Sequence, residues 1–374
     1  MKQLIIVDNE KPNYLSEYLL NNNINSVFLV RGRDSFYQSG SMNYIKDLDN
    51  KIEFHHFFNF SINPKIEDVI IGINEFMESK AQIIIAIGGG SVIDMAKLIR
   101  IKHPINQPIE DFLLNNPSFQ SNIELIAIPT TAGTGSESTH FSVMYIGKKK
   151  YSIASKSMLP NTVLLNAKLT YSTSAKLTAI TGMDALSQAI ESYWSTNSTL
   201  ISINYSRSAI KRILKYLPIA VNEISNEEAK KNLLLAANEA GKAINITKTT
   251  APHAISYSFT SHFNIPHGQA VAITLPLFLL FNYQVSESDC NDTRGFKHVQ
   301  QSILEIAQLF GVSKPIEAEK HLRNFINQIG IEIDLDKLGI NRKLFNSKIL
   351  PNINVERLSN NPRKLTNDWY KTLF

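Results

Sequence analysis

The chain has 374 residues, of which 43% are hydrophobic and 19% charged, and its formal net charge is +5. This length suits about two domains, and the composition is typical of a globular enzyme rather than a disordered or fibrous chain. The single cysteine, Cys290, excludes an internal disulfide framework and fits a reducing compartment.

A basic chain could also bind nucleic acid. Here the basic residues are scattered, and the densest run, Lys148-Lys149-Lys150, is typical of a solvated turn. An enzyme with an anionic substrate and cofactor explains the charge better. The first apolar run is too short for a secretory signal, and the stretch 270–281 is too short to cross a bilayer. We therefore expect a cytoplasmic protein that binds neither nucleic acid nor membrane.

Short apolar runs alternate with helical patterns in the first half of the chain. Strands are predicted at residues 4–7, 26–30, 52–57, 83–87 and 123–128, and helices at 14–22, 66–79 and 93–101. This alternation predicts a mostly parallel sheet with helices on both faces. A β-hairpin is expected at 141–146 and 151–154, joined by the lysine run, and a last strand at 162–165.

The pattern becomes helical from about residue 174. Long helices are predicted at 175–194 and 226–243. We place a boundary near residues 168–174. It separates an α/β domain over residues 1–170 from an all-helical domain over residues 171–374.

Two glycine-rich elements follow predicted strands. Gly88-Gly89-Gly90-Ser91 joins a buried strand to a helix, where glycines and free N–H groups can approach a phosphate closely. An ordinary turn is the alternative. In the second element, residues 129–137, glycines interleave with hydroxyl side chains that can bind phosphate and ribose oxygens. Two such loops after consecutive strands favour a nucleotide-binding edge.

A candidate metal site is spread over the second half of the chain. Asp184 and Gln188 are four residues apart, hence on one helix face. On one straight helix His253 and His267 would lie about 21 Å apart, but residues 264–266 include a proline that breaks the helix. The chain can then fold back and bring both imidazoles together. Such ligands suit Fe²⁺, Zn²⁺ or Mn²⁺, unless each histidine is an ordinary packed or surface residue.

These motifs together resemble the iron-containing (group III) alcohol dehydrogenase family, from about residue 24 to the end. The match includes Asp94 and Lys97 after the first glycine loop, residues 265–268, and the ending 361–366. The resemblance implies an α/β dinucleotide-binding domain and an all-α metal- and substrate-binding domain, as in the dehydroquinate synthase-like fold, with cofactor and metal in the cleft between them. It implies an NAD(P)-dependent, metal-containing alcohol dehydrogenase or aldehyde reductase, with Fe²⁺ expected before Zn²⁺ or Mn²⁺.

The resemblance also implies roles for single residues. Tyr257, His253 and His267 would act on the substrate; many relatives have histidine at position 257, but tyrosine can also donate a proton. The metal ligands would be Asp184, Gln188, His253 and His267. Gln188 replaces the usual histidine, and an amide oxygen is a weaker ligand than imidazole; this predicts a low metal affinity, or no metal, as in the metal-independent reductases of the superfamily. The cofactor would be bound by Gly88, Gly89, Gly90, Ser91, Asp94, Thr130, Thr131, Thr134, Ser136 and Lys156.

The end of the second strand bears on the choice of coenzyme. NAD-preferring relatives commonly carry an acidic residue at the position of Gly32, where it binds the ribose 2′-hydroxyl and repels a 2′-phosphate. With glycine there, Arg31, Arg33 and Ser35 could bind that phosphate. We expect NADP(H) to be favoured over NAD(H), unless Asp34 serves the 2′-hydroxyl.

Residues 187–194 and 243–253 resemble a narrower branch, the phosphonoacetaldehyde reductases of phosphonate biosynthesis, which make 2-hydroxyethylphosphonate. Lys248, Thr249 and Thr250 would lie within about one helical turn of His253 and could hold a phosphonate, unless Lys248 is an ordinary surface residue. A small, anionic aldehyde and a homodimeric enzyme are therefore expected. The alternatives are an alcohol dehydrogenase for uncharged alkanols, a lyase of the dehydroquinate synthase type, and a non-catalytic binding protein.

Overall fold

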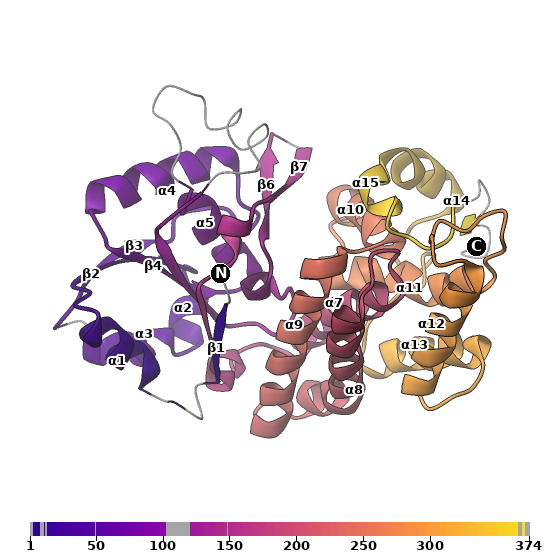
Figure 1. Ribbon diagram of the computed structural model, residues 1–374, viewed down its shortest axis with the longest axis horizontal. Coiled ribbons are helices and arrows are strands. Elements are labelled where there is room, and N and C mark those ends of the chain that lie inside the picture. Colours follow the sequence, from indigo (N-terminus) through magenta and orange to yellow (C-terminus); the bar gives the residue numbers. More distant parts are fainter. Residues whose placement is uncertain are drawn as a thin grey trace. The chain divides into compact units, whose positions relative to one another are not determined.

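The computed structural model describes residues 3–7, 11, 13–48, 50–101, 120–147, 149–365 and 369–370. The chain forms two compact units, Met1–Thr173 and Ser174–Phe374. The first is an α/β unit and the second consists of helices (Figure 1).

The first unit is built on a six-stranded sheet with the strand order β1-β8-β5-β4-β2-β3, in which every pairing is parallel. Parallel strands place all their carboxyl ends at one edge, where ligands bind in open α/β sheets. The strands are β1 Leu4–Val7, β2 Ser26–Arg31, β3 Glu53–Phe57, β4 Ile83–Gly88, β5 Glu124–Pro129 and β8 Thr162–Leu165.

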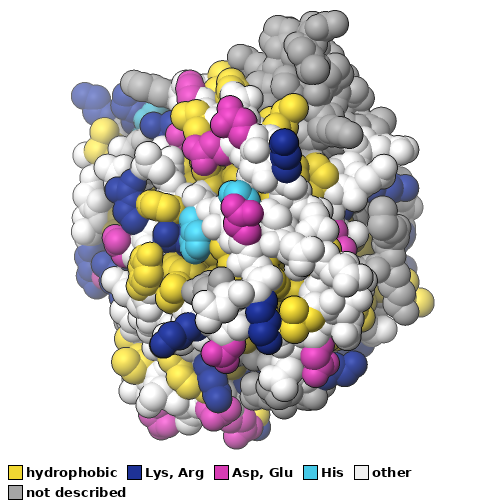
Figure 2. Space-filling view, turned by 90° about the vertical axis from the view of Figure 1, so that its left-hand side faces the viewer, with side chains coloured by type: hydrophobic (Ala, Val, Ile, Leu, Met, Phe, Trp, Pro, Cys, Tyr) yellow, Lys and Arg dark blue, Asp and Glu magenta, His cyan; other side chains and the backbone are white. Residues whose placement is uncertain are grey.

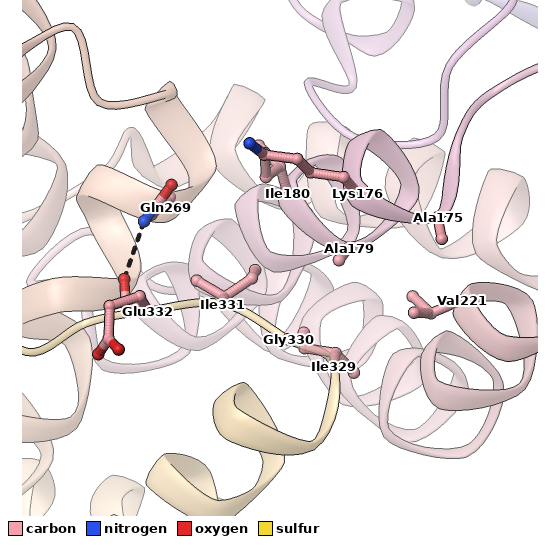
Figure 3. A pocket seen from close by; sticks show the side chains of 10 residues that line it. All are labelled: Ala175, Lys176, Ala179, Ile180, Val221, Gln269, Ile329, Gly330, Ile331 and Glu332. Atoms are coloured by element: carbon pink, nitrogen blue, oxygen red, sulfur yellow. Dashed lines mark hydrogen bonds between the residues drawn. The ribbon is translucent and has the colours of Figure 1, made fainter.

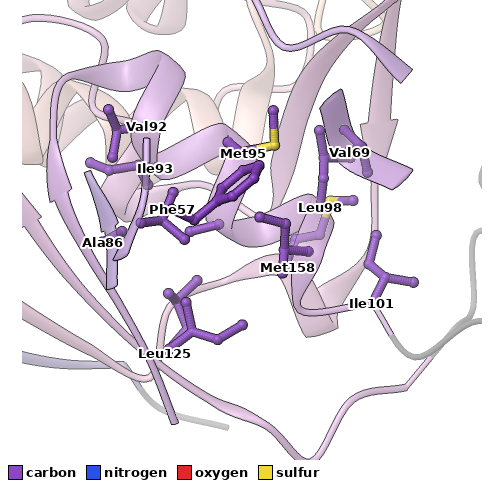
Figure 4. Close-up of a cluster of buried hydrophobic side chains, with 14 of the residues drawn as sticks. Phe57, Val69, Ala86, Val92, Ile93, Met95, Leu98, Ile101, Leu125 and Met158 are labelled. Carbon is purple, nitrogen blue, oxygen red and sulfur yellow. The ribbon is translucent and has the colours of Figure 1, made fainter. Parts of the chain in front are cut away.

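Helices cover both faces of this sheet, as predicted. Phe28 and Val30 point into one core with helices α4 and α5, whereas Val27 and Leu29 point into the other with α1. This alternation follows from the period of two in a strand. Figure 4 shows the first core, whose side chains come from the sheet and from α4 and α5. The helices are α1 Tyr14–Asn21, α2 Ser35–Gln38, α3 Ser41–Ile45, α4 Ile66–Ser79 and α5 Gly90–Ile99.

Two local predictions need correction. Helix α5 begins at Gly90, three residues before the predicted start, because the chain turns into the helix directly from strand β4. The hairpin β6 Phe141–Ile146 and β7 Lys149–Ala154 is antiparallel as expected, but Lys149 and Lys150 belong to its second strand. Gly147, with φ +57°, takes the turn instead; Lys148 is outside the described residues.

The second unit is helical, as predicted, and helices α7, α8 and α9 pack against one another (Figure 1). Helix α7 has the bounds that the sequence predicts, while α9 runs one turn beyond the predicted end. The helices are α7 Ala175–Trp194, α8 Leu200–Asn222, α9 Glu227–Thr247, α10 Ala251–Phe263, α11 His267–Tyr283, α12 Phe296–Leu309, α13 Pro315–Gln328, α14 Arg342–Leu344 and α15 Val355–Leu358. Single-turn 3₁₀ segments lie at Lys46–Leu48, Ser136–Ser138, Lys156–Met158, Ala167–Thr170 and Leu350–Asn352, and a π-helical turn at Phe345–Ile349.

Charge is mixed on the face that Figure 2 presents. Lysine and arginine side chains there are interspersed with acidic ones and do not form a single stripe. Among the described residues, no helix combines the length and the apolar character that a membrane crossing requires.

Candidate functional site

The two glycine-rich loops meet at the carboxyl edge of the sheet. Strands β4 and β5 are paired with Gly88 opposite Pro129, and the Thr130 amide donates to the Gly88 carbonyl at 3.0 Å. A Cβ atom at Gly90 would lie 2.7 Å from the Thr134 hydroxyl oxygen, so a larger residue there would have to displace the Thr134 side chain. The loops therefore form a glycine-lined surface at the N-terminus of α5, which suits a phosphate group.

The hydroxyl and charged side chains predicted to bind the cofactor differ in how exposed they are and in whether they bind other residues of the protein. Thr134 and Lys156 are exposed and Ser91 and Thr131 half-buried, whereas Thr130 is buried. Asp94 and Ser136 are hydrogen-bonded to each other. Both contact the fully buried Lys97, whose Nζ donates to Ser136 Oγ at 3.0 Å and lies 3.8 Å from Asp94 Oδ1. These two predicted cofactor-binding residues thus link helix α5 to the second glycine-rich loop.

Burial lowers the pKa of Lys97 to about 8, although the charges of Asp94 and Glu137 oppose this. Its ammonium also donates to Thr139 Oγ1 at 2.9 Å and to the Phe141 carbonyl at 2.9 Å. Lys97 therefore ties α5 to the segment that leads into the hairpin.

The predicted 2′-phosphate site needs one correction. Arg31 is buried, its guanidinium lies 4.0 Å from the ring centre of Phe58, and its Nε donates to His56 Nδ1 at 2.9 Å. It is therefore engaged inside the unit rather than turned to a ligand. Arg33 is exposed and reaches Asn59 at 2.5 Å, next to Gly32 and the exposed Ser35.

In the helical unit, Asp184, His253 and His267 come together as predicted. One ligand atom from each lies within 4.8 Å of the other two. Asp184 Oδ1 is 3.3 Å from His253 Nε2 and 3.8 Å from His267 Nε2. A carboxylate and two imidazoles in this geometry can hold a divalent transition-metal ion.

The turn between α10 and α11 produces this geometry. Helix α10 ends at Phe263, Asn264 adopts the left-handed conformation with φ +54°, and α11 begins at His267 directly after Pro266. The next residue, Gly268, packs so tightly on α7 that a Cβ there would lie 2.0 Å from the Ile180 carbonyl oxygen. The helix break was predicted; this close contact was not.

A fourth residue, Glu191, completes the surroundings of His253. Its buried carboxylate is hydrogen-bonded to His253 Nδ1, which leaves Nε2 for the cluster. Burial lowers the pKa of His253, but the nearby Glu191 and Asp184 charges outweigh burial and raise it to about 10. Sequence reasoning assigned Glu191 no role. The signal was its spacing, since Asp184, Gln188 and Glu191 lie at i, i+4 and i+7 on one helix face.

The other residues predicted for the metal and the substrate lie on the same helices. Gln188 is buried one turn after Asp184. The Tyr257 ring stacks on His267 with ring centres 5.9 Å apart, and the His253 and His267 rings are 5.3 Å apart. The Tyr257 ring thus lies against one imidazole of the cluster.

The expected phosphonate pocket has a different local structure. Helix α9 ends at Thr247 and α10 begins at Ala251, so residues 248–250 form the connection between these helices and lie outside the helix that carries His253. Lys248 is half exposed and its Nζ lies 3.2 Å from Glu356. The buried Thr250 donates its hydroxyl to Glu191 at 2.8 Å and accepts from Trp194 Nε1 at 2.9 Å. Thr249 is also buried, and its carbonyl accepts from Asn360.

A cavity of about 390 Å³ lies elsewhere in the helical unit (Figure 3). Its lining is mostly apolar, and at its edge the Gln269 amide donates to the Glu332 carbonyl at 2.9 Å. None of the cluster residues lines it, so we assign it no part in the site.

Comparison with known families identifies both units. Residues 3–167 match the family described as iron-containing alcohol dehydrogenase, and residues 178–374 match the C-terminal domain of the same family. This confirms the resemblance inferred from the motifs.

Three similar proteins illustrate the range of the family. The chain is 30% identical to a phosphonoacetaldehyde reductase of Streptomyces viridochromogenes, covering 76% of this chain and 73% of that protein. It is 35% identical to a probable alcohol dehydrogenase, EutG, of Salmonella typhimurium over 59% of this chain, and it spans only 57% of that relative's length. The crystal structure of a sulfoacetaldehyde reductase from Bifidobacterium kashiwanohense in complex with NAD⁺ superimposes with a TM-score of 0.88 at 29% identity, covering 99% of this chain and 96% of that one.

Proposed function

Because the chain belongs to the iron-containing alcohol dehydrogenase family, we propose that it reduces a small aldehyde to a primary alcohol with NAD(P)H and a divalent metal ion. The observation that carries the proposal is the cluster of Asp184, His253 and His267. The glycine-lined edge of the first unit supports the dinucleotide part.

Different residues of the chain would bind the cofactor, bind the metal ion and donate the proton. The loops around Gly88–Ser91 and Thr130–Thr134 would hold the pyrophosphate and ribose, and Asp184, Gln188, His253 and His267 would hold the metal. When bound, the nicotinamide supplies the hydride and the metal ion withdraws charge from the carbonyl oxygen. Tyr257, stacked on His267, would donate a proton at the alcohol oxygen.

We propose phosphonoacetaldehyde as the substrate, reduced to 2-hydroxyethylphosphonate. Two relatives act on aldehydes that carry a tetrahedral anion next to the CH₂–CHO group, one a phosphonate and one a sulfonate. Lys248 is the cation assigned to that anion, with Thr249 beside it. We leave Thr250 out because its hydroxyl is hydrogen-bonded to both Glu191 and Trp194.

The test compares NADH and NADPH oxidation with phosphonoacetaldehyde, sulfoacetaldehyde and butanal, before and after chelation. Lys248→Ala should lower kcat/KM for phosphonoacetaldehyde on the order of 10- to 150-fold, the value of a charge-assisted contact, and leave butanal unchanged. Glu356→Gln is the matched control, because it removes the partner of Lys248 but keeps the cation. Full activity after thorough chelation would contradict the role of the metal.

The alternative is an alcohol dehydrogenase for uncharged alkanols. The Lys248–Glu356 ion pair favours it, because a lysine already neutralised at the surface attracts an anion less strongly. Equal losses on phosphonoacetaldehyde and butanal in Lys248→Ala would support this alternative.

A further inference from the structure

Glu191 contacts two different parts of helix α10 with its two carboxylate oxygens. Oε2 accepts from the Thr250 amide at 2.7 Å and from the Thr250 hydroxyl at 2.8 Å. Oε1 is hydrogen-bonded to His253 Nδ1. The carboxylate is fully buried. Thr250 is the residue that precedes α10, so one oxygen caps this helix and the other holds an imidazole.

We infer that Glu191 is a positioning residue for the metal site, an inference that rests on the proposed metal-dependent function. When a metal ion is bound, a carboxylate at Nδ1 keeps the single ring proton on that nitrogen, so that the lone pair of Nε2 is directed at the metal. In the structure His253 Nε2 is the atom that faces Asp184 Oδ1, at 3.3 Å.

The spacing of residues along helix α7 links Glu191 to Asp184. Glu191 follows Asp184 by seven residues, which returns it to the same helix face two turns later. One helix therefore supplies a metal ligand and also the group that orients a second ligand from α10. A shift of α10 relative to α7 would break the Oε2 contacts and misdirect His253 together.

A purely structural role is the competing explanation. A buried carboxylate at the N-terminus of α10 would stabilise the helix without any effect on the imidazole. The two oxygens allow these roles to be separated, because Thr250→Val removes the hydroxyl hydrogen bonds to Glu191 Oε2 and from Trp194 but leaves the contact of Oε1 with His253.

Glu191→Gln replaces the carboxylate at both of its contacts, with Thr250 and with His253. The Thr250 amide needs an acceptor, so the new amide oxygen would face it and the NH₂ group would face His253. The NH₂ group can only donate to Nδ1, which moves the ring proton to Nε2, the atom required for the metal. Loss of such a partner typically weakens metal binding about 10- to 100-fold.

The experiment measures Zn²⁺ affinity by chelator competition and thermal stability of the metal-free protein, for the wild type, Glu191→Gln and Thr250→Val. We expect Glu191→Gln to bind Zn²⁺ at least tenfold more weakly, and Thr250→Val to lose stability with less than a threefold change in affinity. Two results would overturn the inference: a wild-type Zn²⁺ affinity in Glu191→Gln, or losses of Zn²⁺ affinity that are proportional to the losses of thermal stability in both variants. A wild type that binds no Zn²⁺ would overturn the proposed function as well.

A second measurement does not depend on any variant. In the zinc-loaded wild type labelled with ¹⁵N-histidine, the spectrum should show His253 bound through Nε2 with a proton on Nδ1. Coordination through Nδ1 would overturn the inference even if Glu191→Gln failed to fold.

Discussion

At the scale of single residues, the absence of a side chain at Gly268 allows helix α11 to pack closely on α7 beside the candidate metal cluster. The contact with the Ile180 carbonyl brings α11 onto α7 and so carries His267 to Asp184. A backbone oxygen cannot move aside as the end of a flexible side chain can. Any residue larger than glycine must therefore displace one helix from the other.

Gly268→Ala should weaken Zn²⁺ binding more than tenfold and destabilise the helical unit by about 1–3 kcal/mol, the usual cost of overpacking. Zn²⁺ titration and urea denaturation followed by tryptophan fluorescence would measure both. Gly182→Ala is the matched control on α7, because the three atoms nearest to its new methyl group all belong to the side chain of Leu217 and not to the backbone. Metal binding that is unchanged in Gly268→Ala would show that the close contact is not needed.

The three residues of the candidate metal cluster could be found from the sequence, whereas the residues that pack around them could not. Asp184, His253 and His267 stand out because few residue types bind metals and because Pro266 explains how two distant histidines can meet. Glu191 and Gly268 depend on which face of α7 meets α10 and α11, and that packing is not encoded in local spacing. Arg31 was assigned to a ligand because exposure cannot be read from a charge alone; the aromatic rings around it bury its guanidinium.

At the scale of elements, helices α7 and α9 enclose a lysine that is almost fully buried. Lys230 of α9 donates to Thr178 Oγ1 of α7 at 2.9 Å. Burial lowers its pKa from an ordinary value of 10.5 to about 8. Below pH 8 this lysine is charged in both the folded and the unfolded protein, so the cost of burying that charge is present in full.

The pH dependence of stability should reveal Lys230. Between pH 8 and 10.5 the unfolded chain binds the additional proton, so the free energy of unfolding should rise with pH, by on the order of 2–3 kcal/mol from this group. Lys230→Met should lack that rise. Urea denaturation of both proteins at pH 7.5 and pH 10 tests this, and parallel pH curves would contradict it.

At the scale of the whole molecule, the sequence predicts an α/β unit and a helical unit, and the structure contains both. The alternation of strands and helices determines the layers, because a parallel sheet needs helical crossovers. The strand order β1-β8-β5-β4-β2-β3 was not predicted. It depends on which strands pair, and the apolar pattern within one strand does not specify its neighbours in the sheet.

The carboxyl edge of the sheet, where β2 and β4 end, leads to a prediction about the coenzyme. Arg33 and Ser35 follow β2, which lies beside β4 and its glycine loop. We expect NADPH to be preferred, and Arg33→Ala should lower kcat/KM for NADPH about 10- to 150-fold, while the value for NADH changes little. Asp34→Asn tests the opposite assignment: if it impairs NADH specifically, or if the wild type prefers NADH, the prediction is wrong.

Asp184, Gln188 and Glu191 lie on one face of α7. The site is therefore sensitive to any residue inserted or deleted within this helix. One inserted codon between residues 185 and 190 would turn the rest of the helix by about 100°. The helix could still form, yet Glu191 would leave His253 and zinc binding should weaken at least tenfold. An insertion in the exposed turn at residues 223–225, between α8 and α9, should be tolerated. Selection should therefore remove insertions within α7 more strictly than most substitutions there, because an insertion rotates every residue that follows it in the helix.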